Sequence, residues 1–316
     1  MSDRIAPLDI TVIILSFNEE IHIARCIERI RPHVRRVVVV DSFSTDRTVE
    51  IARSLGAETL QHEFENHAQQ FNWALDELEI DSEWILRLDC DEYFDERALN
   101  WFHRELDLLP DTTTAIAFRM MVVFKGTPIL HGGYYSTDFV RVWRSGSSRF
   151  EERWMGERIV TTGEIHKAHG HLVDENLNSI GWWTDKHNHY ATWHVVDLLM
   201  RQYSPKNRSI PHERSASRKI RFKRFIRDNG YYRAPLFLRP LMRWFYRYVL
   251  RLGFLDGKHG FIWHFLHGLW FYMLIDIKLF EARQYIRKYG IEAYERQIAL
   301  VYGLNFSLHN EGALSA

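Results

Sequence analysis

The sequence predicts an α/β fold, in which a mixed, mostly parallel sheet is flanked by helices and followed by a C-terminal helical region. Three observations support this prediction. Apolar strand-like runs alternate with helix-like segments over the first 90 residues, as in parallel sheets with right-handed crossovers. Polar and acidic clusters follow three of these strands. The chain after residue 200 is strongly basic and aromatic.

The expected strands of the first half are continuous apolar runs, which are typical of strands buried on both faces. They are "DITVIIL" (9–15), "VVVV" (37–40), "AETLQH" (57–62) and "EWILRLD" (83–89). A helix capped by Asn18 should end before Pro32, and a second should end near Leu55 with Gly56 at its C′ position. A third helix is expected at 66–78.

The pattern changes after residue 100. Strands are expected at 115–126 and 138–146, which would extend the sheet in a mixed arrangement. A basic connector follows at 206–235, and the chain from residue 236 onward is aromatic and helical in pattern.

Composition narrows the class of protein. The chain has 316 residues, of which 46% are hydrophobic and 26% charged, enough for an ordinary globular core. Two cysteines exclude a disulfide scaffold and indicate a reducing compartment. The N-terminus, "MSDRIAPLD", has no apolar stretch, so no signal peptide is expected. The formal net charge is zero, but residues 201–260 hold 16 Lys/Arg and 3 Asp/Glu.

An acidic cluster, Asp89, Asp91 and Glu92, follows the strand at 83–89. Like charges this close repel unless a cation lies among them. Carboxylates at such a position can hold Mg²⁺ or Mn²⁺, which completes its shell with water and substrate phosphates. The alternative is a solvated acidic turn that starts a helix.

Three polar segments should meet at one edge of the sheet. "SFNEE", "DSFSTD" and "DCDE" each follow a strand, and ligands of parallel sheets bind at the carboxyl ends of the strands. The sequence has no G-x-G-x-x-G, no G-x-x-x-x-G-K and no serine elbow, which argues against dinucleotide, P-loop and serine-hydrolase sites.

The segments "VIILSFNEE", "VVVVDSFSTDRT" and "WILRLDCDE", in this order and spacing, resemble the inverting family 2 glycosyltransferases, which have the GT-A fold. The resemblance is closest to the branch that acts on lipopolysaccharide core and exopolysaccharide repeat units. Segments 154–160, 174–191 and 246–272 also look like parts of bacterial exopolysaccharide glycosyltransferases.

The resemblance implies roles for individual residues. Asp89 and Asp91 match the D-x-D motif that holds the cation against the donor diphosphate. Glu157 in "MGER" matches the general base, although Gly156 and Arg158 stand where relatives often have Asp or His and then His. The alternative for Glu157 is a surface carboxylate paired with Arg158 or Arg153. The implied nucleotide-sugar site consists of Ser16, Asn18, Glu19, Asp41, Ser42, Asp46 and Asp89.

The implied activity is transfer of a sugar, with inversion, from a nucleotide-sugar (a UDP-sugar) to a lipid-linked saccharide. Residues 1–205 would form the catalytic domain and residues 206–316 the membrane or acceptor side. Two alternatives remain open, a sugar-nucleotide nucleotidyltransferase and a non-catalytic membrane scaffold of the same fold.

The basic aromatic region suggests where the protein works. Arg239, Arg243, Arg247 and Arg251 recur every four residues among Leu and aromatic residues. This pattern favours an amphipathic helix lying in an anionic membrane surface over nucleic-acid binding. We therefore expect a peripheral protein on the cytoplasmic face of the membrane, with Lys186 also on the acceptor side. The alternative is a pair of helices packed on the catalytic domain with solvated arginines.

Overall fold

The computed structural model describes residues 6–64, 66–151, 159–203, 234–303 and 308. By its internal contacts the chain divides into two compact units, residues 1–178 with 255–259, and residues 179–254 with 260–316. The predicted boundary after residue 205 differs from this division. Helix α5 (Ile180–Tyr203) groups with the second unit because it packs against α9 (Phe271–Tyr289).

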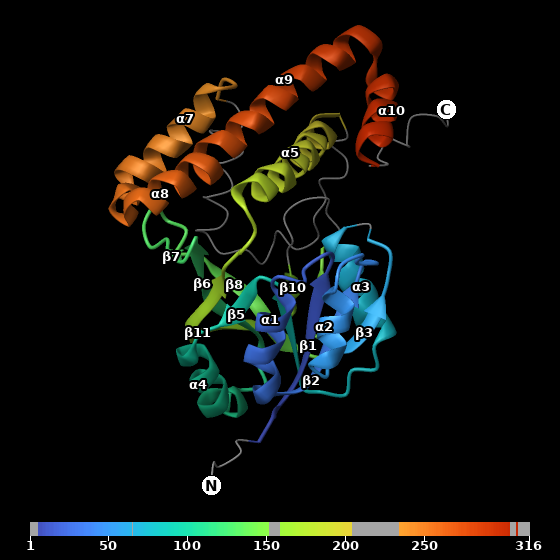
Figure 1. The fold of residues 1–316 in the computed structure, drawn as a ribbon, viewed down its shortest axis with the longest axis vertical. Coiled ribbons are helices and arrows are strands. Elements are labelled where there is room, and N and C mark those ends of the chain that lie inside the picture. Colours follow the sequence, from blue (N-terminus) through green and yellow to red (C-terminus); the bar gives the residue numbers. More distant parts are fainter. Residues whose placement is uncertain (1–5, 65, 152–158, 204–233, 304–307, 309–316) are drawn as a thin grey trace. The chain divides into compact units, whose positions relative to one another are not determined.

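The first unit is built on one mixed sheet with the strand order β3-β2-β1-β4-β8-β6-β11-β5, and β7 pairs with β6 (Figure 1). A separate two-stranded ribbon joins β9 to β10. The strands are β1 (Leu8–Ser16), β2 (Val34–Asp41), β3 (Glu58–Gln61), β4 (Trp84–Asp89), β5 (Glu92–Phe94), β6 (Thr113–Phe124), β7 (Thr127–Pro128), β8 (Asp138–Arg144), β9 (Ser148–Phe150), β10 (Ile159–Thr161) and β11 (Glu164–Asp174).

Strands β3, β2, β1 and β4 are parallel, as the sequence predicted. Their register aligns the strand ends, because Ser16 of β1 lies opposite Asp41 of β2, and Leu15 lies opposite Asp89 of β4. The polar segments that follow these strands therefore start at the same edge of the sheet.

Alternate residues of the parallel strands enter two different cores. Val12 and Val39 face one side, under helices α1 (Ile23–Ile30), α2 (Thr48–Ser54) and α4 (Glu96–Glu105). Ile13 and Val38 face the other side, under α3 (His67–Glu77). Since both faces are covered, the strands are apolar throughout, which explains the continuous runs in the sequence.

Local chemistry sets the ends of the helices. Helix α1 ends at Ile30 and gives way to a short 3₁₀ turn that contains Pro32. Gly56 has φ 78° just after α2, the left-handed conformation that glycine favours at such a position. Asn18 is not the N-cap of α1 as expected, because α1 begins at Ile23 and Asn18 lies in the preceding loop with φ 54°.

The antiparallel half of the sheet brings later strands to the site. Strand β8 lies between β4 and β6 and is antiparallel to both. Strand β11 runs parallel to β6 and antiparallel to β5, so that Asp174 lies opposite Glu92. Two further short 3₁₀ turns lie at Leu106–Leu108 and Gly253–Asp256.

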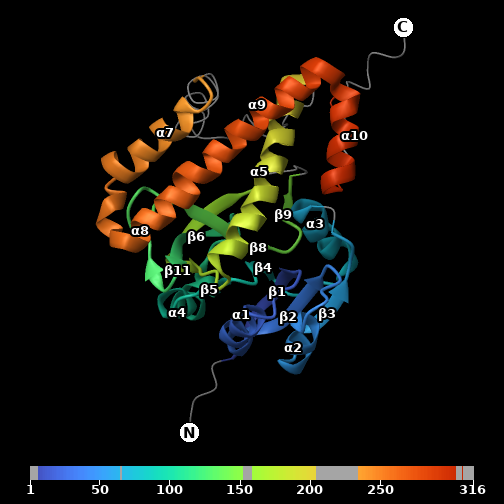
Figure 2. The same ribbon diagram turned by 45° about the horizontal axis from the view of Figure 1, so that its top comes forward.

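The second unit is helical within the described residues. Helix α7 (Leu238–Phe245) continues into a π-helical turn (Tyr246–Leu250), and α8 (Gly257–Trp263) continues through a second π-helical turn (His264–Trp270) into α9. Helix α7 packs against the second of these turns, and Figures 1 and 2 show α7 beside the α8–α9 helix. No helix of the described chain combines the length and apolar character needed to cross a membrane.

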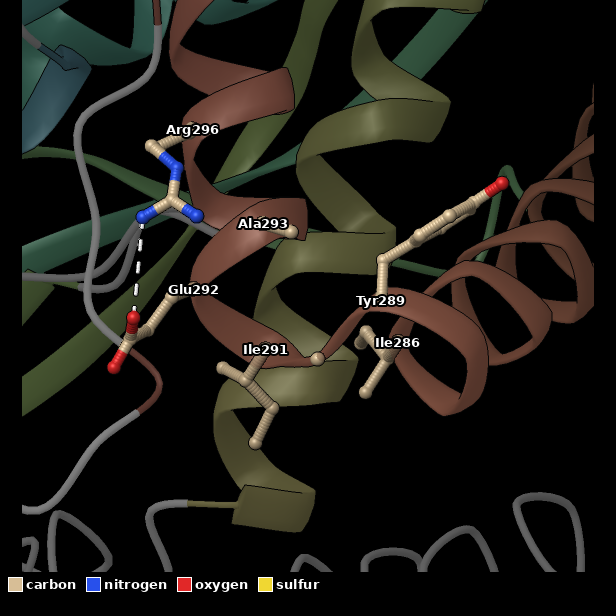
Figure 3. A pocket seen from close by; sticks show the side chains of 7 residues that line it. Ile286, Tyr289, Ile291, Glu292, Ala293 and Arg296 are labelled. Atoms are coloured by element: carbon tan, nitrogen blue, oxygen red, sulfur yellow. Dashed lines mark ion pairs between the residues drawn. The ribbon is translucent and has the colours of Figure 1, made fainter.

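Helix α10 (Ile291–Tyr302) follows α9 after a sharp turn at Gly290, which has φ 88°. Figure 3 shows a pocket at this turn, with an ion pair between Glu292 and Arg296 at its side. Its remaining lining comes from Ile286, Tyr289, Ile291 and Ala293. No residue of the predicted nucleotide-sugar site belongs to it.

Candidate active site

The loops after β1 and β2 are joined by hydrogen bonds. Asn18 N donates to Ser44 Oγ at 2.8 Å, and Asn18 Oδ1 accepts from Thr45 N at 2.8 Å. One residue further on, Glu19 N donates to Thr48 Oγ1 at 2.8 Å. Two segments that are more than 20 residues apart in sequence thus form one polar surface at the carboxyl edge of the sheet.

Asp41 holds the centre of this surface. Its carboxylate is fully buried and accepts hydrogen bonds from Ser16 Oγ (3.0 Å), Ser44 N (2.8 Å) and Gln61 Nε2 (3.4 Å). A carboxylate with this many hydrogen-bond donors orders the loop around it. Asp41 therefore acts here through the groups that it positions, and a direct part in nucleotide binding stays a prediction.

Asp46 and Ser42 are fixed in the same loop. Burial raises the pKa of Asp46, but hydrogen bonds from Thr48 and from Glu20 N outweigh it and lower the pKa below its usual value. Ser42 Oγ accepts from Gln70 Nε2 at 3.1 Å. Both predicted residues therefore lie in the polar surface that joins the two loops.

Glu19 connects this surface to the segment after β11. Its Oε2 lies 2.6 Å from Nδ1 of His22, and Nε2 of His22 lies 2.8 Å from the backbone N of Leu177. Because Leu177 N donates to Nε2, the ring proton is on Nδ1 and His22 donates to Glu19. His22 is completely buried, and no motif in the sequence pointed to it.

Two aromatic rings on these loops were also missed. Phe17 is 57% exposed and Phe43 is 54% exposed, and each stands between polar residues of a predicted nucleotide loop. Phe43 has φ 59°, which is uncommon for a residue with a side chain and tends to occur at functional sites. The "SF" that begins both loops was the available sequence signal.

Asp89, the first acid of the D-x-D sequence, is held by two buried arginines. Arg87 Nη2 lies 2.9 Å from Asp89 Oδ1, and Arg141 Nη2 lies 3.5 Å from Asp89 Oδ2. Burial raises the pKa of Asp89, but the charges of Arg87 and Arg141 outweigh it and hold the pKa well below its usual range. Asp89 is therefore an ionised carboxylate with both oxygens partly engaged.

Glu92 lies beneath Asp89 in the same network. It forms two bonds with Arg141, at 3.0 and 2.6 Å, and its Oε2 accepts from Asp89 N at 3.1 Å. Burial raises the pKa of Glu92 to about 7, with Arg141 opposing the shift and Asp89 adding to it. Burial, followed by the charges of Asp91 and Glu92, also raises the pKa of Asp174. The acidic cluster thus extends to a strand that sequence analysis did not connect with it.

Asp91, the second acid, has the more open carboxylate. Its Oδ2 accepts from Asn176 Nδ2 at 3.0 Å, and its backbone O accepts from Glu175 N at 3.0 Å. Arg25 of α1 reaches the same place, since it donates to Asp91 O (3.4 Å) and to Glu175 Oε2 (2.7 Å). Among the described residues, Oδ1 of Asp91 has no hydrogen-bond partner.

This donor set fits a divalent cation that is shared with a ligand. Its oxygen-only chemistry suits Mg²⁺ or Mn²⁺. Within the described ranges, no three His, Cys, Asp or Glu side chains are placed to hold a metal ion together. Asp91, with Asp89 beside it, would supply one or two ligands, and substrate phosphates and water would supply the rest.

Glu157 lies outside the described residues, as do Gly156 and Arg158. The strands on either side are described, and Phe150 of β9 pairs with Ile159 of β10. Phe150 also contacts the acidic network, because the guanidinium of Arg87 lies 5.0 Å from the centre of its ring. The strand that precedes Glu157 therefore packs against the residue that holds Asp89.

In the second unit the predicted arginines do not form one exposed stripe. The expectation that Arg239 faces a membrane is wrong, because Arg239 is 4% exposed and paired with Asp276. Arg243 lies 4.0 Å over the ring of Tyr272, Arg247 is half-buried, and only Arg251 is exposed. Arg239 and Arg243 lie on α7 itself and face α9, where Asp276 and Tyr272 contact them.

Lys186 belongs to the second unit and lies on α5. Its Nζ is 4.6 Å from the ring centre of Trp182 and 5.9 Å from that of Tyr190. These aromatic neighbours favour a positive charge at this point, and the predicted contact with the acceptor stays a prediction.

The sheet order, the flanking helices and the loops at the ends of β1, β2 and β4 define a fold of the GT-A type. Residues 11–131, which contain all of these loops, match the model of glycosyl transferase family 2. An uncharacterized glycosyltransferase from Rickettsia prowazekii is 28% identical over 204 residues, which cover 60% of this chain and 68% of the relative. Over residues 11–131 the chain is therefore similar to the family 2 glycosyltransferases.

Shorter and more distant similarities were also found. The succinoglycan biosynthesis protein ExoA from Rhizobium meliloti is 34% identical over 98 residues, or 28% of this chain and 30% of that protein. A solved structure of glucosyl-3-phosphoglycerate synthase from Mycobacterium tuberculosis, in complex with Mn²⁺, UDP and glucosyl-3-phosphoglycerate, aligns with a TM-score of 0.30 and 21% identity. That alignment covers 36% of this chain and 43% of the synthase.

Proposed function

We propose that the protein is a metal-dependent, inverting glycosyltransferase that moves a sugar from a nucleotide-sugar, a UDP-sugar, to a lipid-linked saccharide in bacterial surface polysaccharide synthesis. One observation supports this proposal above the others. The two joined loops and the D-x-D acids lie at one edge of the sheet, inside the segment that matches family 2. A nucleoside diphosphate needs this combination of polar loop groups and a cation site.

In this proposal the polar surface from Ser16 to Asp46 binds the nucleoside, and the acids face the diphosphate. A bound Mg²⁺ or Mn²⁺ would supply positive charge that stabilises the diphosphate as a leaving group. Asp91 would hold the cation with its open oxygen. Arg87 and Arg141 keep Asp89 ionised and fixed beside Asp91, so the site is organised before the donor arrives.

Inversion requires the acceptor hydroxyl to attack from the side opposite the leaving nucleotide. A carboxylate that removes the hydroxyl proton serves this step, and we assign it to Glu157. The support is the matching position of "MGER" in the sequence and the contact of the preceding strand with Arg87.

The proposed acceptor rests on a sequence similarity, and the proposed location rests on the charge of one section of the chain. ExoA is a succinoglycan biosynthesis protein, which favours exopolysaccharide among the surface polysaccharides. The basic section at 201–260 suits a protein that works at an anionic membrane face. We therefore propose a peripheral protein on the cytoplasmic side, close to acceptors that are carried on lipid.

The decisive experiment is a panel of nucleotide-sugars tested for thermal shift and donor hydrolysis with Mg²⁺ or Mn²⁺. We expect one UDP-sugar to stabilise the protein only when metal is present, because diphosphate and cation bind together. The Asp91→Asn variant should lose this shift and the hydrolysis, whereas Asp107→Asn, which changes an exposed acid of a surface turn, should retain both.

Two results would overturn the proposal. Wild-type turnover by Asp91→Asn would remove the metal assignment. Formation of a nucleotide-sugar from a nucleoside triphosphate and a sugar phosphate, without hydrolysis of any donor, would instead identify a nucleotidyltransferase. Measurable donor hydrolysis excludes the non-catalytic scaffold.

A further inference from the structure

The helix α7 presents its apolar side chains outward. Leu241 is 46% exposed, Met242 55% and Phe245 51%, while Arg239 on the same helix is 4% exposed. A helix on the surface of a water-soluble protein normally shows the reverse, with charges outside and an apolar stripe inside. The exposed positions 238, 241, 242 and 245 have the spacing of a single helix face.

The arginines are turned inward because they have partners there. Arg239 Nε lies 2.7 Å from Asp276 Oδ1 on α9, and Phe237 N donates to the other oxygen of Asp276 at 2.9 Å. Arg243 lies over the ring of Tyr272, also on α9. These contacts fix the rotation of α7, so its exposed apolar residues cannot turn inward without breaking a buried ion pair.

Helix α7 and the helix formed by α8 and α9 make a helical hairpin. The second arm of this hairpin also exposes apolar side chains. Phe261 is 48% exposed and Phe265 is 42% exposed, one turn apart on α8 and the turn that follows it, and Leu250 before the connection is 61% exposed. Helix α7 packs against this arm (Figure 2). The apolar face, as we define it, comprises Leu241, Met242, Phe245, Leu250, Phe261 and Phe265.

Charge indicates what covers the apolar face. Residues 234–276 contain two acids, Asp256 and Asp276, and five Lys/Arg, of which Arg251 and Lys258 are exposed. Asp256 is engaged by the backbone N of Leu130 and of His131. The hairpin thus presents no free carboxylate, and Arg251 is exposed at its end with Tyr246 as its neighbour, 3.3 Å away. Apolar and aromatic residues with a cationic border suit the headgroup and acyl boundary of an anionic bilayer.

We infer that the apolar face enters the upper acyl layer of a lipid bilayer, with the helices in the plane of the membrane and Arg251 at headgroup level. This inference deepens the proposed membrane location and does not depend on the catalytic assignment. It replaces a surface contact made by arginines with insertion of apolar side chains. Insertion should resist salt, because burial of apolar surface is not screened by ions.

The first test places a polarity-sensitive fluorophore on the apolar face. Cys26 and Cys90 are buried at 0% and 3% exposure, so a thiol reagent should label an added exposed cysteine selectively in the folded protein. We expect labelled Phe245→Cys to shift its emission to the blue with phosphatidylcholine–phosphatidylglycerol vesicles. Labelled Leu300→Cys is the matched control, because Leu300 is 87% exposed on α10, and its emission should not change.

The second test measures sedimentation with the same vesicles in about 1 M salt, where the Debye length is about 3 Å. Wild-type protein should remain bound. The triple variant Leu241→Ser, Phe245→Ser and Phe265→Ser should bind at least about tenfold less, since each side chain gives up burial of its apolar surface. The pair Leu300→Ser and Val301→Ser should bind like wild type.

Three outcomes would overturn the inference. The first is complete release of the wild type by salt, and the second is vesicle binding without an emission shift at position 245. The third is a blue shift that appears without vesicles as the protein concentration rises, which would show that a second copy covers the apolar face. Donor hydrolysis assayed without vesicles tests the proposed function separately, so failure of one does not imply failure of the other.

Discussion

Arg141 connects two carboxylates of the candidate site. It pairs with Glu92 at 2.6 Å and lies 3.5 Å from Asp89, away from water. Its removal leaves buried negative charge without a partner, which typically costs about 3–5 kcal/mol. We therefore expect Arg141→Met to lower the free energy of unfolding, measured in urea, by that amount.

Arg149→Met is the matched control for this prediction. Arg149 pairs with Asp76, but both side chains are more than half exposed, and exposed pairs contribute little to stability because water and salt screen them. If both variants lose the same free energy of unfolding, then the buried ion pairs of Arg141 do not stabilise the protein more than the exposed pair does.

Glu157 supports a prediction about rate rather than stability. A general base acts in the transition state and contributes little to donor binding. Glu157→Gln should therefore lower kcat by about 10²-fold or more, while the affinity for the donor stays near the wild-type value. Glu96→Gln, a change of an exposed acid in the first turn of α4, should alter neither. Loss of donor affinity with kcat preserved would move Glu157 to the nucleotide site.

The sequence pointed to those residues of the candidate site that follow the parallel strands. Asp41 and Asp89 end strands whose apolar pattern is local and clear. Arg141 and Asp174 could not be found in this way, because they come from β8 and β11. Those strands join the site through the order of the antiparallel half of the sheet, and no local pattern encodes that order.

At the scale of elements, strand β11 lies so close to helix α4 that only glycine fits between them. Gly170 has φ 95°, and a Cβ atom there would lie 2.2 Å from the backbone N of Ala98. We expect Gly170→Ala to cost about 1–2 kcal/mol for the left-handed conformation and about 1–3 kcal/mol more for the clash.

Gly126→Ala separates the two costs. Gly126 also has a positive φ, 76°, but nothing lies within 4 Å of its added Cβ. The Gly126→Ala variant should therefore lose only the stability that the left-handed conformation costs, as measured by thermal or urea unfolding. If Gly170→Ala is no less stable than Gly126→Ala, then the close packing of β11 on α4 has been overestimated.

Element prediction succeeded where a local signal marks a segment. Continuous apolar runs mark the parallel strands, and Pro32 marks the turn that ends α1. The prediction of an exposed basic helix face failed, because the first two arginines of the repeat, Arg239 and Arg243, have partners on α9. The partner of Arg239, Asp276, lies 37 residues further along the chain.

At the scale of the molecule, charge is divided between sections of the chain. Residues 201–260 have a balance of +13, and the rest of the chain balances it to zero. An anionic membrane should attract the basic section of the chain and repel the acidic remainder. In the proposed membrane location, electrostatic attraction would bring the protein to the surface, and insertion of the apolar face would then hold it there.

This division leads to a prediction about exposed charges, with Arg239 left intact because it is buried. Arg251→Glu together with Lys258→Glu should weaken binding to anionic vesicles at low salt by more than about 2 kcal/mol, at about 1 kcal/mol for each basic residue near the surface. The difference from wild type should shrink in about 1 M salt, where charges are screened. Co-sedimentation over a salt series measures both quantities.

Arg287→Glu together with Lys288→Glu is the matched control, because it makes the same change of charge at exposed positions in the last turn of α9. If the membrane contact is local to the hairpin, this pair should bind nearly as well as wild type. An equal loss in both pairs would mean that net charge alone controls binding. A loss by Arg251→Glu and Lys258→Glu that persists in high salt would mean that these residues act by something other than electrostatic attraction to the lipid.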